Sequence, residues 1–189
     1  MQLLDTLGSA TVSANVLDAL VSGVRISASL VVSEAGDFSG EEGSSKTLSS
    51  AADTLWLSAL RRNSQIVLTS GMTFRIEQYR MPKTADLAVL TRSELDLSGL
   101  APRPEQRTHL LQSSTSFESS VADVQSLGYE RVHIEFGPTG IAALLRSGLA
   151  FTLFLSGPST NSIERAAERL GAKVTQLGVV DGLHLAKAR

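Results

Sequence analysis

The sequence contains no cysteine among its 189 residues. This absence excludes disulfides, thiolate metal sites and a cysteine nucleophile, and with them the disulfide framework of small extracellular domains. No apolar run approaches the roughly 20 residues that a membrane-spanning helix needs, and the first residues lack the basic segment of a signal peptide. We therefore expect a cytoplasmic protein that does not associate with membranes.

An excess of basic charge is also missing. The chain has 17 basic and 19 acidic residues, a formal net charge of −2, whereas a general nucleic-acid binder shows a basic stripe. The phosphate-binding loop of nucleoside triphosphatases, G-x-S-x-G and H-E-x-x-H are absent. The three histidines, His109, His133 and His184, show no metal-ligand spacing. We expect neither a nucleic-acid partner nor a bound metal.

What the sequence does contain is typical of one globular domain. Hydrophobic residues make up 42% of the chain and charged residues 19%, as in ordinary soluble proteins. A chain of this length hides roughly 70% of its unfolded surface, which is enough for a core without disulfides. We assign residues 1–189 to a single domain and treat residues 1–23 as an N-terminal extension.

Two hydrophobic patterns alternate along the chain, one typical of strands and one of helices. The terminal strands flank Asp181-Gly182, a strong hairpin signal. Alternation of this kind predicts an α/β fold: a three-layer sandwich with a mixed, mostly parallel sheet, helices on both faces and an antiparallel hairpin at the end. Strands are expected at 24–32, 65–69, 87–91, 108–112, 131–136, 150–158, 173–180 and 183–188, and helices at 50–63, 116–127, 137–148 and 161–171.

Polar residues at the predicted helix starts indicate N-caps. Ser50 precedes Asp53 by three residues, and Thr115 and Glu118 have the same spacing, which is that of a capping box. For the last helix, either residue of Asn161–Ser162 is an acceptable cap.

Two glycine turns follow predicted strands, in the segments TSGMTFR (69–75) and IEFGPTG (134–140). Backbone N–H groups freed at a helix start favour a phosphate, and Arg75 adds a cation to the first turn. Either turn by itself is compatible with a plain structural connection, but two of them favour a ligand with a diphosphate. Glu135 ends its strand at the edge where α/β sheets bind ligands, so it orients a substrate, moves a proton, or lies solvated beside a helix cap.

Helix 50–63 carries two further candidates. Trp56 fits a core position better than a stacking platform, and Arg61-Arg62 either complements the helix dipole or binds an anion.

The order of these motifs resembles the RibD C-terminal family, the dihydrofolate-reductase-like reductase domain of riboflavin biosynthesis. The resemblance runs from Val24 to Pro158 through ISASLVVSEAG, TLSSAAD, LRRNSQIVLTSGMTFR, LAVLTRS, VHIEFGPTG and LFLSGP. It implies the cofactor NADPH, hydride transfer to a phosphoribosylamino-pyrimidine as the small-molecule substrate, and a homodimer. The apolar strand AFTLFLSG (150–157) and the terminal hairpin agree with a dimer, because exposed apolar patches tend to pair.

The resemblance also implies a set of site residues. Gly71 and Gly137 lie in the two cofactor turns, and Arg92 lies on the adenosine side. From their charge, and not from the resemblance, Arg75 and Arg92 are candidate partners of a 2′-phosphate. Glu135 is the candidate catalytic residue, with Glu34 as the reserve. The remaining candidates are Ser49, Ser70, Thr73, Thr91, Pro138, Thr139 and Gly140 for the cofactor, and Ser33, Leu48 and Arg61 for the substrate.

Three departures from the family pattern leave two functions open. Ala35 stands where the family has aspartate, Phe136 where it has glycine, and Asp53-Thr54 where it has an arginine. The glycine turns and Glu135 favour an NADPH-dependent reductase, whereas the departures favour a catalytically degenerate NADP(H)- or ligand-binding protein. The zinc deaminase that accompanies this domain in the family is excluded by the lack of cysteine.

Overall fold

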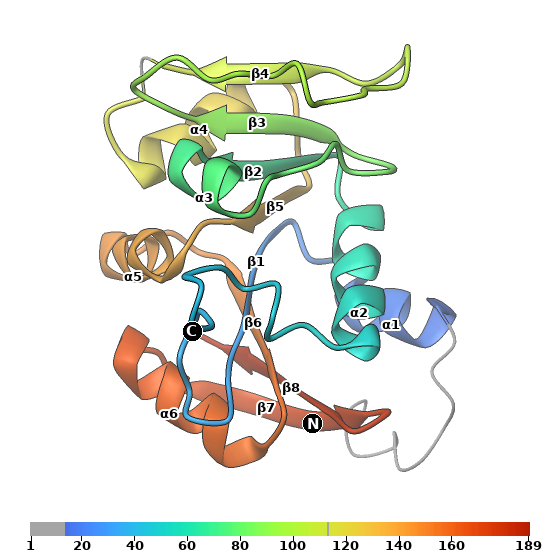
Figure 1. Cartoon of the computed structure of the whole chain (residues 1–189), viewed down its shortest axis with the longest axis vertical. Coiled ribbons are helices and arrows are strands. Elements are labelled where there is room, and N and C mark those ends of the chain that lie inside the picture. Colours follow the sequence, from blue (N-terminus) through green and yellow to red (C-terminus); the bar gives the residue numbers. More distant parts are fainter. Residues whose placement is uncertain (1–13, 113) are drawn as a thin grey trace.

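The computed structural model describes residues 14–112 and 114–189. Within them, eight strands form one sheet in the order β4-β3-β2-β5-β1-β6-β8-β7, which Figure 1 shows running from top to bottom. The strands are β1 (Ile26–Val31), β2 (Ile66–Ser70), β3 (Asp86–Leu90), β4 (Thr108–Leu111), β5 (Val132–Glu135), β6 (Thr152–Gly157), β7 (Val174–Val180) and β8 (Leu183–Ala188).

The sheet is mixed but mostly parallel, as predicted. Strands β1 to β6 pair in parallel, β8 runs antiparallel to β6, and β7 runs antiparallel to β8. Asp181 and Gly182 both have positive φ angles, 46° and 75°, as a tight hairpin turn requires. The predicted C-terminal hairpin is therefore confirmed.

Helices cover both faces of the sheet, which confirms the three-layer architecture. The helices are α1 (Ala14–Val21), α2 (Ala51–Arg62), α3 (Gly71–Ile76), α4 (Phe117–Ser126), α5 (Pro138–Ser147) and α6 (Thr160–Leu170). Alternate residues of β2 divide between the two layers: Ile66 and Leu68 join the core beneath α4, α5 and α6, whereas Val67 joins the core beneath α3. Helices α1 and α2 share a third cluster with β6, β7 and β8.

Serine side chains cap four of these helices, α2, α3, α4 and α6. The prediction for Ser50 is confirmed, because its side chain accepts the N–H of Asp53. The cap of α4 is Ser116, in a reciprocal pair with Ser119, rather than Thr115. The cap of α6 is Ser159 rather than a residue of Asn161–Ser162.

Helix α1 lies inside the segment expected to be an extension. Its residues Leu17, Leu20 and Val21 are buried in one cluster with Trp56, and Asp18 accepts a bond of 2.8 Å from Arg62. From Leu17 onward this segment thus contributes to the core. None of the helices in the described ranges has the length and apolar character to cross a membrane.

Candidate functional site

A cleft of about 1520 Å³ lies along the edge where the parallel strands end. Its wall includes Ser70 at the end of β2, Leu90 at the end of β3, and Glu135 at the end of β5. Strand β5 lies between β1 and β2 although it follows both in sequence. Ligands of open α/β sheets bind at such a change in strand order, outside the carboxyl ends.

Most of the predicted site residues line this cleft. All of the predicted cofactor-binding residues do so, and so do Arg61 and Glu135. Ser33, Glu34 and Leu48 do not belong to its lining. The chain turns after β1, with the N–H of Gly36 bonded to the carbonyl of Ser33, and the Glu34 carboxylate accepts a bond of 2.9 Å from Ser159. The structure thus places Glu34 against the start of α6.

The two glycine turns come together at the cleft. Ser70 caps α3 by accepting the N–H of Thr73 at 3.1 Å, and Gly137 precedes α5 without any side-chain cap bond. A Cβ built on Gly137 would lie 3.8 Å from Thr73 Oγ1. The starts of α3 and α5 are therefore adjacent, as a shared ligand of both turns requires.

The glycines in these turns are not all required for the same physical reason. A Cβ on Gly71 would lie 2.9 Å from Thr91 Oγ1, and one on Gly140 would lie 2.7 Å from Phe136 Cβ. These two positions need glycine for packing. Gly137 does not, because its φ is −66° and, adjacent residues aside, a Cβ there would meet only Thr73 Oγ1 within 4 Å among the described residues. The space left open there faces the cleft.

The two arginines of the predicted cofactor site, Arg75 and Arg92, differ in hydrogen bonding and exposure. Arg75 donates to the Gly71 carbonyl at 2.9 Å and to Ser93 Oγ at 2.5 Å. Arg92 is exposed and is the second residue after the end of β3. Thr91 is buried and donates to the Ser93 carbonyl, so it shapes the turn that carries Arg92.

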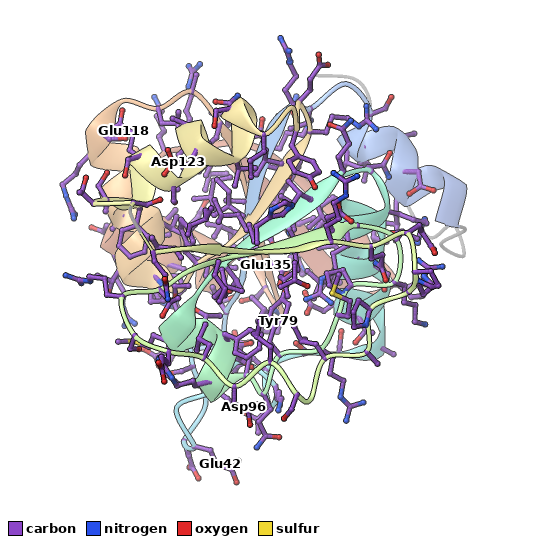
Figure 2. The ribbon with its side chains drawn as sticks, turned by 90° about the horizontal axis from the view of Figure 1, so that it is seen from above. Glu42, Tyr79, Asp96, Glu118, Asp123 and Glu135 are labelled. Carbon is purple, nitrogen blue, oxygen red and sulfur yellow. The ribbon has the colours of Figure 1, made fainter. Side chains whose placement is uncertain are left out.

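Glu135 is held by two partners at the centre of the cleft wall. Arg61 forms a bidentate pair with it, Nε–Oε1 and Nη2–Oε2 both at 2.7 Å, and the Tyr79 hydroxyl donates to Oε2 at 2.7 Å. Figure 2 shows Tyr79 and Glu135 next to each other near the centre of the view, whereas the other labelled acids lie toward the periphery. Sequence reasoning missed Tyr79, which follows α3 in a segment without a motif.

These contacts fix the charge of Glu135. Burial favours a raised pKa, but the charge of Arg61 and the hydrogen bonds from Arg61 and Tyr79 outweigh it and lower the pKa to about 2. Burial also raises the pKa of Tyr79 well above its usual value. At neutral pH, Glu135 is a carboxylate without a proton to donate, and its geometry fits the orienting role.

His133 lies behind this ion pair and is neutral. It is fully buried, with Nδ1 2.8 Å from Ser27 Oγ and Nε2 3.2 Å from Ser29 Oγ. Burial lowers its pKa to about 4. The described residues hold no cluster of three or more histidine or acidic side chains with the spacing of a metal site.

Asp53 is a second acid in the cleft wall. It is 5% exposed, and Ser156 Oγ donates to its Oδ1 at 2.5 Å. Burial raises its pKa, while hydrogen bonds from Ser156 and Ser49 partly oppose the rise. The sequence identifies Asp53 only as a capping partner of Ser50 and as a departure from the family pattern. The missed signal is its spacing with Trp56 and Leu60 at i+3 and i+7, which places it on the buried face of α2.

Comparisons with known proteins give the fold a context. The sequence matches no family model and no curated protein. A pyrimidine reductase-like protein of Corynebacterium diphtheriae has a TM-score of 0.69 at 14% identity, over 92% of this chain and 98% of its own. For the riboflavin biosynthesis reductase of Saccharomyces cerevisiae the TM-score is 0.60 at 12% identity, over 99% and 95%.

A third neighbour is the bifunctional pyrimidine deaminase and uracil reductase of Thermotoga maritima. Its TM-score is 0.57 at 16% identity, over 87% of this chain and 56% of its own. The structural neighbours are thus pyrimidine reductases of riboflavin biosynthesis and proteins like them, which confirms the fold that the sequence resemblance predicts.

Proposed function

We propose that this protein is an NADPH-dependent reductase whose cleft holds the cofactor beside a small-molecule substrate. The observation that carries the proposal is the meeting of two helix starts at the cleft, with Gly137 leaving space in front of an uncapped helix. Backbone N–H groups at such a start bind phosphate. The reductase fold of the neighbours supports the same function.

The residues present fit NADPH. Ser70, Thr73 and the turn 137–139 would hold the pyrophosphate, and Arg75 and Arg92 would face the 2′-phosphate. The cofactor, when bound, supplies a hydride. Glu135, held as an anion by Arg61, would orient a hydrogen-bond donor of the substrate. A pyrimidine of the riboflavin pathway is the substrate that the neighbours suggest, and another small imine or carbonyl is compatible with the same site.

The proposal is tested by substitution at Gly137. A fluorescence titration should show that Gly137→Val weakens NADPH binding by about tenfold or more, since 1.4 kcal/mol of lost phosphate contact suffices. Gly99→Val is the matched control, because a Cβ on Gly99 meets nothing within 4 Å and Gly99 lies outside the cleft. Equal NADPH affinity in the parent and Gly137→Val would refute this placement of the cofactor.

A second candidate function is dinucleotide or ligand binding without turnover. It is favoured by Glu135, whose pKa of about 2 removes one candidate proton donor. NADPH oxidation assayed with pyrimidines, imines and carbonyls separates the two. Tight NADPH binding without turnover of any of them would select this candidate.

A further inference from the structure

A strip of polar side chains crosses two neighbouring strands in the middle of the sheet. Ser27 and Ser29 belong to β1, and His133 and Glu135 belong to β5. Residues two apart on a strand lie on the same face of the sheet, and Ser27 is the register partner of His133. The inner members, Ser27 and His133, are buried, whereas Ser29 and Glu135 belong to the cleft lining. The strip therefore connects the buried imidazole to the cleft.

The charge of Glu135 decides which nitrogen of His133 carries the hydrogen. His133 is fully buried and neutral, so one ring nitrogen donates a hydrogen bond and the other accepts one. Nε2 lies 3.6 Å from Oε1 of Glu135, where a carboxylate attracts an N–H hydrogen and repels a bare lone pair. Nε2 therefore carries the hydrogen, and Nδ1 accepts the hydroxyl hydrogen of Ser27 at 2.8 Å.

This tautomer fixes the direction of the hydrogen bond between His133 and Ser29. Nε2 lies 3.2 Å from Oγ of Ser29, so the hydroxyl oxygen accepts the bond from Nε2–H. A hydroxyl group has one hydrogen of its own to donate. Within the part of the chain that the structure describes, the Ser29 hydroxyl has no hydrogen-bond partner besides His133. Its hydrogen is thus available to a ligand in the cleft.

We propose that Ser29 contacts the substrate by donating a hydrogen bond to an uncharged acceptor, a carbonyl oxygen or an sp² nitrogen, and that His133 is the residue that positions it. The N–H of the imidazole polarises the hydroxyl group and strengthens the bond that this group donates. An anionic acceptor is disfavoured, because the Glu135 carboxylate lies beside the same imidazole. The inference deepens the proposed function and rests on it for the use of the cleft as a substrate site.

Three probes that share a phenyl ring separate the acceptor from the charge. Acetophenone offers a carbonyl oxygen, α-methylstyrene has a CH₂ group in its place, and benzoate carries a negative charge. In NMR titrations of the parent protein, acetophenone should bind more tightly than benzoate. Ser29→Ala should weaken acetophenone binding by about three- to tenfold and leave α-methylstyrene binding within about a factor of two.

The matched control for this variant is Ser98→Ala, because Ser98 is exposed and lies outside the cleft. It should bind all three probes as the parent does. Absence of acetophenone binding by the parent, or equal losses of acetophenone and α-methylstyrene in Ser29→Ala, would overturn the inference. Tighter binding of benzoate than of acetophenone would do the same.

The positioning role of His133 has a spectroscopic signature that needs no variant. In the parent at pH 7, the ¹⁵N resonances of the imidazole should show a protonated Nε2 and an unprotonated Nδ1, and the opposite tautomer would refute the role. His133→Gln keeps an N–H group and should retain acetophenone affinity, whereas His133→Leu should weaken it in the same direction as Ser29→Ala. Unchanged acetophenone affinity in His133→Leu would contradict the positioning role.

A titration with NADPH separates this inference from the proposed function. If NADPH fails to bind the parent while acetophenone binding depends on Ser29, the proposed function is wrong and the Ser29 site stands. If NADPH binds and acetophenone binding does not depend on Ser29, the inference fails and the proposed function stands.

Discussion

At the residue scale, the strongest polar contact in the cleft wall is the bidentate ion pair between Arg61 and Glu135. The Arg61 side chain is 26% exposed and that of Glu135 is 11% exposed, so solvent screens the pair only in part. Removing one member of such a pair strands the other charge, which costs more than the pair itself contributes. The Tyr79 hydroxyl adds one further bond, to Oε2 of Glu135.

We expect Arg61→Met to lower the free energy of unfolding at pH 7 by about 3–5 kcal/mol, and Tyr79→Phe by about 1 kcal/mol. Urea unfolding measures both. In the parent, the contribution of Glu135 is present above its unfolded pKa of 4.5 and is lost as pH falls toward its folded value of about 2. The deficit of Arg61→Met should therefore shrink below pH 4.5. A deficit independent of pH would contradict this assignment.

His133 should make stability depend on pH in a higher pH range than Glu135 does. Its pKa is about 4 in the folded protein against 6.5 for the free side chain, so the unfolded chain binds the extra proton between these values. Stability should fall as pH drops from 6.5 toward 4, by up to about 3 kcal/mol. His133→Gln should flatten this slope in urea unfolding series, and an unchanged slope would show that other groups cause it.

Arg92 should determine the choice between cofactors. It is exposed after β3, and a 2′-phosphate distinguishes NADPH from NADH. Arg92→Ala should weaken NADPH binding by about tenfold while NADH binding stays within a factor of two to three. Arg103→Ala, an exposed arginine outside the cleft, is the control. Equal losses for both cofactors would remove Arg92 from this role.

At the element scale, the starts of α3 and α5 are shaped by packing as much as by hydrogen bonds. The ring of Phe136, where the family pattern has glycine, is 1% exposed and lies 4.8 Å from that of Phe117. Gly140, one turn into α5, lets these rings approach the helix. Phe136 is thus committed to the core beneath α5.

We expect Gly140→Ala to destabilise the protein although alanine is the better helix former. The gain in helix propensity is about 1 kcal/mol, but the new Cβ would lie 2.7 Å from Phe136 Cβ and 2.9 Å from Phe117 Cε1. Overpacking of this kind costs about 1–3 kcal/mol. Gly137→Ala should leave thermal stability unchanged by comparison. A higher melting temperature for Gly140→Ala would show that the two rings adjust freely.

At the scale of the whole molecule, the structure changes the reason for expecting a homodimer. Strand β6 lies inside the sheet between β1 and β8, and Leu153 and Leu155 are fully buried. Its apolar surface is therefore not available for pairing. Strand β7 is the free edge at this end of the sheet, and Val179 on it is 42% exposed.

We still predict a homodimer, now through the β7 edge. Light scattering at micromolar concentration should give twice the chain mass of 20.0 kDa, and Val179→Lys should shift the protein toward the monomer, because charged side chains block edge pairing. Leu127→Lys, an exposed position at the end of α4, is the control. A single species of 20.0 kDa in the parent would refute the dimer.

The sequence alone determined most of the element pattern and indicated the edge of the sheet at which the cleft lies. Hydrophobic period, the Asp181-Gly182 turn and the two glycine turns are local signals, and local signals indicate where strands, helices and turns lie, though not every helix end. The missed features lack such signals. Tyr79 follows α3 in a segment without a motif, and α1 lies within residues 1–23, where we expect only an extension from the sequence.

The tertiary structure decided which charges meet. Glu135 is an anchored anion because α2 brings Arg61 to the end of β5 and the segment after α3 brings Tyr79. Asp53 is a buried acid because β6 places Ser156 against α2. The pKa of a carboxyl depends on burial and on neighbours that are remote in sequence. For that reason the residue types were visible in the sequence, while their ionisation and their partners were not.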